Sequence, residues 1–179
     1  MSMEEKQNSQ TSLDFNQNIF KPTSREEIVE IVKTCYRKNI PLEINGLKSK
    51  NKIGRNFQSE KTLDLSDYKG IIDYKPEELY IKVKAGTPLK EIIGELDKNN
   101  QQLAFEPNDF GYLFSGQSNS GSIGGVVSCN FAGSRRFKVG SVRDHILGFQ
   151  GINGKGETIK SGGTCLLYTS DAADERWRG

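Results

Sequence analysis

Histidine, cysteine and tryptophan are scarce in this sequence. The one histidine is His145, so no cluster of histidine ligands for a metal forms within the chain. The three cysteines, Cys35, Cys129 and Cys165, are widely spaced and match neither a metal-binding pattern nor a disulfide framework. Cys35 follows apolar residues at helical spacing, so we expect it to pack in a core.

Long apolar runs and an excess of charge of one sign are also missing. No run approaches the length of a membrane span, and residues 1–18 hold no apolar signal core, so we expect a cytoplasmic protein. The net charge is +2, and basic residues alternate with acidic ones instead of forming the stripe typical of nucleic-acid binding. The 179 residues suffice for one domain with a sizeable core.

Glycine, by contrast, is abundant in the second half of the chain. Of the 19 glycines, 13 lie between Gly111 and Gly163. Glycine weakens helices and strands, so this density indicates a backbone that turns sharply or approaches something closely. The stretch from Gly121 to Gly148 also carries arginines, serines and Asp144, which suits a loop around an anionic ligand. Ordinary turns between strands explain the composition equally well.

The first part of the chain is expected to be a small α/β unit. Residues 1–18 are polar and predict a mobile arm, with order beginning at Phe20. Ser24 and Glu27 form an S-x-x-E capping box, and an apolar stripe at i, i+3, i+4 and i+7 from Ile28 predicts a helix that ends at Asn39. Residues 41–44 and 62–65 predict two short strands, and this unit is taken as residues 19–68.

A second unit, residues 69–164, is expected to contain antiparallel strands. Residues 71–74 and 79–83 predict strands around a turn. Thr87 as N-cap and Pro88 at the first helical position predict a helix. Residues 145–152 and 157–159 flank Asn153-Gly154-Lys155-Gly156, whose Asn-Gly pair predicts a hairpin. The chain as a whole therefore reads as α+β.

Two segments have the composition of a phosphate site. The loop from Asn45 to Gly54 has glycines near both ends and several lysines, which suits an anion-binding nest, although a solvated lysine loop explains it too. Ser122 and the Gly124-Gly125 pair predict a tight turn that opens a short helix, whose amides face a phosphate or simply cap the helix. Arg135, Arg136 and Arg143 either clamp anions or form surface ion pairs.

Taken together, these segments resemble the FAD-binding domain of the vanillyl-alcohol oxidase/p-cresol methylhydroxylase type. The resemblance covers roughly residues 20–163 and rests on PLEINGLKSK, QQLAFEPNDFG, SIGGVVSCNFAGSRR and GSVRDHILGFQGINGKGE. Within that superfamily these motifs are most similar to those of the FAD-binding subunits of bacterial glycolate oxidases. It implies a fold of two α/β subdomains, the second incomplete in this sequence, with the ADP arm of the flavin between them.

The resemblance also implies site residues, a cofactor and partners. It assigns to the pyrophosphate loop Asn45, Gly46, Lys48, Ser49, Lys50 and Gly54. It assigns to a second FAD-contacting block Pro107, Ser122, Ile123, Gly124, Gly125, Asn130, Gly133, Gly140 and Asp144. The first loop has no histidine for covalent attachment, which implies non-covalent FAD.

The activity implied is oxidation of a 2-hydroxy acid such as glycolate, beside a second flavoprotein subunit and an iron–sulfur subunit. Those subunits would account for a peripheral place at the inner membrane. A non-catalytic FAD-binding subunit and another flavin oxidoreductase of the same type are the alternatives.

The C-terminal residues depart from the family pattern. After Gly163 the family continues with K-N-x-x-G-Y-D and G-S-x-G-T-L-G segments, whereas residues 165–175 read CLLYTSDAADE. That string matches a translated transposase adapter from DNA library preparation, so residues 165–179 are interpreted as a non-native tail. We therefore expect the chain as written to be marginally stable and to bind FAD weakly or not at all.

Overall fold

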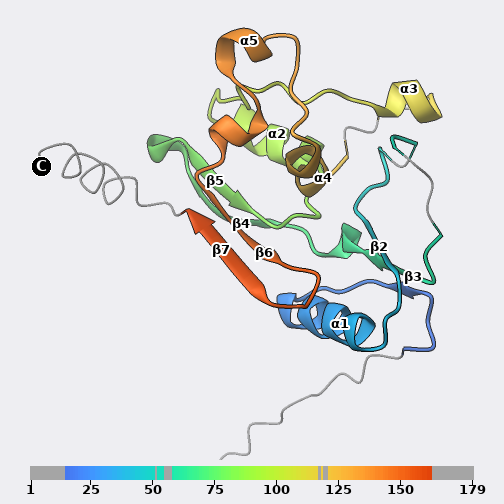
Figure 1. Ribbon diagram of the computed structural model, residues 1–179. Helices are drawn as coiled ribbons and strands as arrows, with labels where there is room; N and C mark the ends of the chain where they lie inside the picture. Colours follow the sequence, from blue (N-terminus) through green and yellow to red (C-terminus); the bar gives the residue numbers. More distant parts are fainter. Residues whose placement is uncertain (1–14, 51, 55–57, 117, 119–120, 163–179) are drawn as a thin grey trace, which may run out of the picture.

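Three short parallel strands and one helix form the N-terminal part of the fold (Figure 1). The computed structural model describes residues 15–50, 52–54, 58–116, 118 and 121–162. The strands β1 (Ile19–Phe20), β2 (Leu42–Asn45) and β3 (Lys61–Asp64) lie in the order β1-β3-β2, with α1 (Arg25–Arg37) between β1 and β2 along the chain. The buried side chains of this part are Phe20, Ile28, Ile31, Cys35 and Leu63. Cys35 is thus a core residue, as its place in the apolar stripe predicts.

Helix α1 begins and ends for local reasons that the sequence displays. The Ser24 hydroxyl accepts a hydrogen bond from the Glu27 amide at 3.2 Å. The Glu27 carboxylate accepts one at 2.8 Å from the Thr23 amide, one residue earlier than in the expected capping box. Arg37 is the last helical residue, and Asn39 takes a left-handed backbone with φ 53°.

Residues 15–18, just before β1, contact the sheet and its core. Lys61 Nζ donates to the carbonyl oxygens of Phe15, at 3.2 Å, and Gln17, at 2.8 Å. The rings of Phe15 and Phe20 lie 5.2 Å apart between centroids. Packing in this part of the chain thus extends to Phe15, earlier than the predicted start at Phe20. Residues 1–14 of the expected arm and the tail of residues 165–179 lie outside the described residues.

The described residues after β3 add two antiparallel hairpins and four α-helices. Strands β4 (Ile71–Lys75) and β5 (Tyr80–Val83) pair around a 3-10 turn, η2 (Pro76–Glu78), and a further 3-10 turn, η1 (Leu65–Asp67), precedes them. Then follow α2 (Leu89–Asp97), α3 (Gly111–Ser115), α4 (Ile123–Cys129), α5 (Arg136–Val139) and the 3-10 turn η3 (Val142–His145). The hairpin of β6 (Gly148–Ile152) and β7 (Thr158–Gly162) ends the described chain. A second core holds Leu89, Phe105, Val126 and Val142.

The prediction that Thr87 is the N-cap of a helix is wrong. Helix α2 begins at Leu89 with Pro88 as its N-cap, and no side chain caps it. Instead Thr87 is fully buried, where its hydroxyl donates to the Lys84 carbonyl at 2.6 Å and accepts from the Gly70 amide at 3.0 Å. The hydroxyl therefore joins the start of β4 to the end of β5. The sequence could not separate this role from capping, because one of the partners is remote in the chain.

The last hairpin also starts later than predicted. Residues 142–145 form a 3-10 turn with a capping box, in which the Asp144 carboxylate accepts from the Ser141 amide at 2.7 Å. The same carboxylate also accepts from the Ser141 hydroxyl at 2.8 Å. Strand β6 therefore begins at Gly148, not at His145. The hairpin connection lies where it was predicted, but its left-handed residue is Gly156, with φ +78°, and not Asn153 or Gly154. The Gly156 amide donates to the Asn153 carbonyl.

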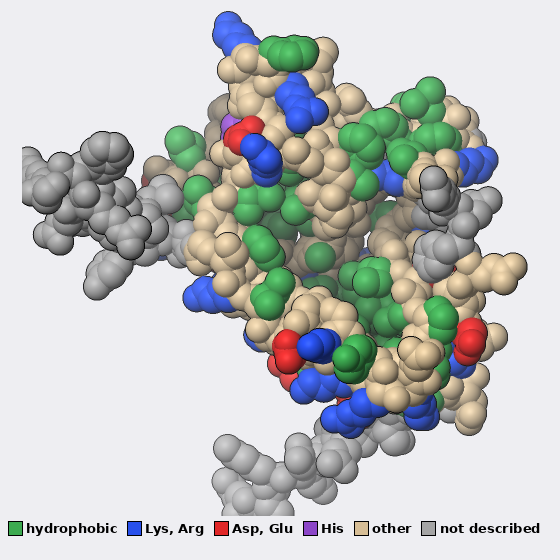
Figure 2. Space-filling view, viewed as in Figure 1, with side chains coloured by type: hydrophobic (Ala, Val, Ile, Leu, Met, Phe, Trp, Pro, Cys, Tyr) green, Lys and Arg blue, Asp and Glu red, His purple; other side chains and the backbone are tan. Residues whose placement is uncertain are grey.

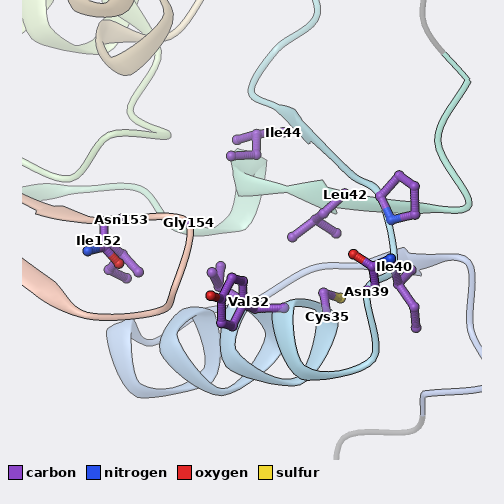
Figure 3. Close-up of a pocket in the computed structure, with 11 residues that line it drawn as sticks. Val32, Cys35, Asn39, Ile40, Leu42, Ile44, Ile152, Asn153 and Gly154 are labelled. Carbon is purple, nitrogen blue, oxygen red and sulfur yellow. The ribbon is translucent and has the colours of Figure 1, made fainter.

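The tip of the β6–β7 hairpin packs against α1, which is far from it in sequence. A side chain at Gly156 would contact the backbone nitrogen of Lys33 at 3.1 Å and the carbonyl oxygen of Val29 at 3.2 Å. Ile152 packs against the N-terminal core. Between α1, β2 and this tip lies an open groove of about 420 Å³, lined mainly by apolar side chains such as Val32, Leu42 and Ile44 (Figure 3).

None of the described helices is long and apolar enough to cross a bilayer.

Candidate functional site

The two glycine-containing segments that the sequence singled out meet in space. In the register of β2 and β3, Asn45 lies opposite Asp64, at the carboxyl ends of parallel strands. The loop that leaves Asn45 runs against the start of α4, where a side chain at Gly46 would overlap the Ser122 hydroxyl. A side chain at Gly121 would likewise overlap the Ser49 hydroxyl. We call this junction, residues 45–50 with 121–125, the cradle.

Buried polar groups line the cradle. The exposed fractions of Asn45, Ser49 and Ser122 are 8%, 9% and 4%. Hydroxyl and amide groups removed from water need hydrogen-bond partners, so their concentration in one place indicates a site built around polar atoms. Glycine at positions 46 and 121 is what allows these side chains to approach the opposite segment.

Lys50 supplies positive charge to the cradle. Its Nζ lies 3.2 Å from the Ser49 hydroxyl and 5.8 Å from the centroid of the Phe110 ring. Burial lowers the pKa of Lys50, while the nearby Cys129 and Asp109 oppose that shift. A partly buried ammonium is favoured by an anion beside it, so the environment of Lys50 suits a phosphate group.

The start of α4 differs from a free helix terminus. The Ile123 amide donates to the Thr87 carbonyl at 2.9 Å, and the Gly124 amide donates to the Ala85 carbonyl at 2.8 Å. A side chain at Gly124 would collide with Ala85, so this glycine permits close packing against the turn before α2. Two of the amides that the sequence analysis assigned to a phosphate therefore donate within the protein instead.

Lys48 stands at the outer edge of the cradle. It is exposed and takes a left-handed backbone with φ 56°, and its charge reaches Asp64 on the neighbouring strand. Burial raises the pKa of Asp64, but hydrogen bonds from Ser66 and the charges of Lys21 and Lys48 outweigh burial and lower it overall. Asp64 is thus ionised at neutral pH, and the charges of Lys21 and Lys48 favour that state.

The remaining residues of the second block lie beyond the cradle and shape turns. Asn130 ends α4 in a left-handed conformation, and its side chain accepts from the Arg143 amide at 3.0 Å. Gly133 packs against the backbone of Glu106, where a side chain would collide. Gly140 adopts φ +88° at the end of α5, next to Asp144. Hydrogen bonds from Ser141 lower the pKa of Asp144. These residues order the segment that follows α4.

Gly54, Pro107 and the arginines of the glycine-rich stretch lie in different environments. Gly54 adopts φ +98° and is exposed, with open space where a side chain would be. Pro107 is half-buried between Glu106 and Asn108. The sequence leaves the arginines open between an anion clamp and surface ion pairs, and two of them form surface pairs: Arg135 with Glu106 at 3.0 Å and Arg143 with Asp144 at 3.7 Å.

Two participants were missed by reasoning from the sequence. Gly121 makes the closest approach to Ser49 and Lys50, and its signal was a glycine directly before a helix N-cap within the glycine-rich stretch. Phe110 presents its ring to Lys50. No local pattern around Phe110 indicated this contact, because it depends on where residues 107–116 pass the loop.

Comparisons with known proteins give a matching family and several relatives. The family described as FAD binding domain matches residues 17–162. Glycolate oxidase subunit GlcE of Escherichia coli (strain K12) is 37% identical over 141 residues, which are 79% of this chain and 38% of that protein. A D-lactate dehydrogenase of Anaerostipes hadrus is 28% identical over 149 residues, 83% of this chain and 30% of that protein. The chain thus spans well under half the length of these curated relatives.

Solved structures share the fold at low sequence identity. An alkyldihydroxyacetonephosphate synthase superposes with a TM-score of 0.65 at 19% identity, over 84% of this chain and 28% of that one. Wild-type Phl p 4.0202, a glucose dehydrogenase, gives a TM-score of 0.65 at 15% identity, over 80% of this chain and 28% of that one. The expected mixed α+β architecture of the p-cresol methylhydroxylase type is confirmed.

Proposed function

The chain belongs to the FAD binding domain family, its cofactor is FAD, and from that premise we propose that the cradle holds the pyrophosphate of the flavin. The observation that carries the proposal is the meeting of residues 45–50 with residues 121–125, where buried hydroxyls and one partly buried lysine face the same junction. This donor set fits a pyrophosphate, which carries negative charge and accepts hydrogen bonds only.

Within this proposal the residues divide into two groups. Asn45, Ser49, Lys50 and Ser122 bind the pyrophosphate directly, and Gly46 and Gly121 keep the approach open. Lys48, Gly54, Pro107, Asn130, Gly133, Gly140 and Asp144 hold the surrounding backbone in place, with Ile123, Gly124 and Gly125 forming the start of α4. Binding is non-covalent, because the loop contains no histidine.

We further propose that the full-length protein is a subunit that oxidises a 2-hydroxy acid. The printed names of the two curated relatives, a glycolate oxidase subunit and a D-lactate dehydrogenase, both denote enzymes of 2-hydroxy acids. When bound, flavin would accept the two electrons of such an oxidation in the form of one hydride. The residues described here bind and orient that cofactor.

A complex is part of the proposal. Glycolate oxidase subunit GlcE is by its name one subunit of an oxidase, which supports partners for this chain too. The partners we propose are a second flavoprotein subunit and an iron–sulfur subunit. The same observation favours the second candidate function, an FAD-binding subunit that supports a catalytic partner and oxidises nothing itself.

The test uses the full-length protein from the same locus. We expect it to purify with flavin absorbance that bleaches under anaerobic glycolate or D-lactate. Lys50→Met should lower flavin retention, whereas Lys90→Met, at an exposed position of α2, should not. A protein that holds flavin but is bleached by no 2-hydroxy acid would favour the supporting role. A protein without affinity for FAD would contradict the cradle assignment.

A further inference from the structure

The Lys50 ammonium lies where the two segments of the cradle meet. A side chain at Gly121 would come within 3.1 Å of Lys50 Nζ, and one at Gly125 within 3.9 Å. Lys50 thus reaches from the first segment to the start of α4, and its side chain is half-buried. Ordering a flexible lysine side chain costs conformational entropy, so contacts with its surroundings are needed to hold it there.

An aromatic ring from another segment faces this ammonium. Lys50 Nζ lies 5.8 Å from the centroid of the Phe110 ring, and Phe110 is the residue that directly precedes α3. Lys52 Nζ donates to the Phe114 carbonyl of the same helix at 2.9 Å. Figure 2 shows hydrophobic and basic side chains together over α3, at the right of the view. Residues 110–114 therefore contact the loop that follows β2 at two separate lysines.

Phe110 is itself held by the chain that follows α4. Its ring lies 4.7 Å, between centroids, from the ring of Phe131. The Gly133 amide donates to the Phe105 carbonyl at 2.8 Å, which joins the same two stretches of chain a few residues away. The position of the Phe110 ring is thus fixed from the C-terminal end of α4, independently of its contact with the lysine.

The contacts of Lys50 hold its ammonium without neutralising it. The Ser49 hydroxyl, 3.2 Å from Nζ, and the Phe110 ring are both uncharged. Among the described residues, no carboxylate lies within ion-pair distance of Lys50. An aromatic ring attracts a cation through its quadrupole and leaves the positive charge in place. A carboxylate partner would instead compete with a phosphate for the same donors.

We propose that Phe110 is a positioning residue for FAD, whose ring holds the Lys50 ammonium in the cradle, charged and facing the pyrophosphate. This inference rests on the proposed function, because it takes the cofactor site from there. The residues that carry it all lie within residues 17–162, the part of the chain that matches the FAD binding domain family. Phe110 acts through Lys50, so its effect on the affinity for FAD requires that lysine.

The experiment measures the Kd of FAD for the full-length apoprotein in a double-variant cycle. Phe110→Leu stays apolar but lacks the ring, and it should raise Kd about two- to fivefold, the range of a cation–π contact. Phe110→Tyr keeps the ring and should match wild type. In a Lys50→Met background, Phe110→Leu should leave Kd unchanged. Phe15→Leu is the matched control and should also leave Kd unchanged, because Phe15 lies 5.4 Å from Lys38 Nζ in a pair of the same kind beside the N-terminal core.

Several results would overturn the proposal. One is a wild-type Kd for Phe110→Leu, and another is an equal rise in Kd for Phe15→Leu. A loss of affinity that persists in the Lys50→Met background would show that Phe110 contacts FAD directly or only supports the fold. Melting temperatures of the apoproteins identify an altered fold, and Phe110→Met replaces Phe110→Leu if that variant is unstable.

Failure of this proposal is distinguishable from failure of the proposed function. If Lys50→Met left the Kd of FAD unchanged, the cradle assignment would fail, and the role of Phe110 would fail with it. If Lys50→Met raised Kd while Phe110→Leu did not, only the role of Phe110 would be wrong. Bleaching of the flavin by 2-hydroxy acids is measured separately and enters neither result.

Discussion

Single atoms decide how closely the two sides of the cradle meet. Gly46 faces only the Ser122 side chain, so a methyl group at position 46 would overlap one hydroxyl oxygen and lie 3.4 Å from Ser122 Cβ. Gly121 faces both Ser49 and Lys50, and its φ of +82° adds a backbone requirement that Gly46 lacks. The two glycines therefore differ in what a substitution would cost.

Gly46→Ala should be rescued by removing the Ser122 hydroxyl. We expect Gly46→Ala alone to destabilise the protein by about 1–3 kcal/mol through overpacking. The double variant with Ser122→Ala should recover most of that loss, because the overlapping oxygen is gone. Urea unfolding of the four proteins of this cycle measures the coupling. Additive effects would mean that the two residues are not in contact.

Gly121→Ala should lower FAD retention more than Gly116→Ala does. Both glycines have positive φ, +82° and +70°, so both alanines carry a left-handed strain of about 1–2 kcal/mol. A side chain at Gly116 meets open space, whereas one at Gly121 meets Ser49 and Lys50. In the full-length protein, we expect only Gly121→Ala to lower FAD retention, measured by flavin absorbance after gel filtration. Similar retention in both variants would separate position 121 from the cofactor site.

At the scale of elements, Thr87 is the point where β4, β5 and the start of α2 are joined. Thr87→Val keeps the shape but leaves the Gly70 amide and the Lys84 carbonyl without the hydroxyl. We expect a loss of about 1–3 kcal/mol in the free energy of unfolding. Thr158→Val, at an exposed position of β7, is the control and should change stability little. Chemical denaturation compares the two, and equal stabilities would show that the buried hydroxyl contributes nothing.

The elements that could be predicted are those whose signals are local. The Ser24 cap and the stripe from Ile28 define α1 without help from the rest of the chain. Strand β6 was placed too early, because apolar residues after Asp144 look extended until the Ser141–Asp144 capping box is recognised. Without the family resemblance, the two segments of the cradle could each be a phosphate site or an ordinary loop, because they are remote in sequence. Only the resemblance to a family joined them.

At the scale of the whole molecule, two depressed carboxyl pKa values predict lower stability in acid. Asp64 and Asp144 have folded-state pKa values below their ordinary value, so the folded protein binds fewer protons than the unfolded chain near that value. Their contribution is complete above the ordinary carboxyl pKa of about 3.9 and is lost as pH falls through the folded-state values.

Asp64→Asn should therefore make the free energy of unfolding fall less steeply as the pH is lowered into the acid range. We expect the variant to be less stable than wild type at neutral pH, with the difference shrinking as the pH is lowered. Urea unfolding from neutral pH into acid measures it, and Asp97→Asn, at an exposed position of α2, is the charge-matched control. A stability difference that stays constant down to low pH would assign the effect of Asp64 to packing and not to its charge.

The hairpin tip against α1 has a consequence for folding during synthesis. Arg25 and Gln150, joined across this contact at 3.5 Å, are 125 positions apart. At ribosomal rates of about 5–20 residues per second, on the order of 10 s pass between the emergence of the helix and that of the strand that covers it. We expect α1 and its strands to wait for that interval with one side of their core uncovered, so nascent chains that lack β6 should bind chaperones more strongly than chains that include it.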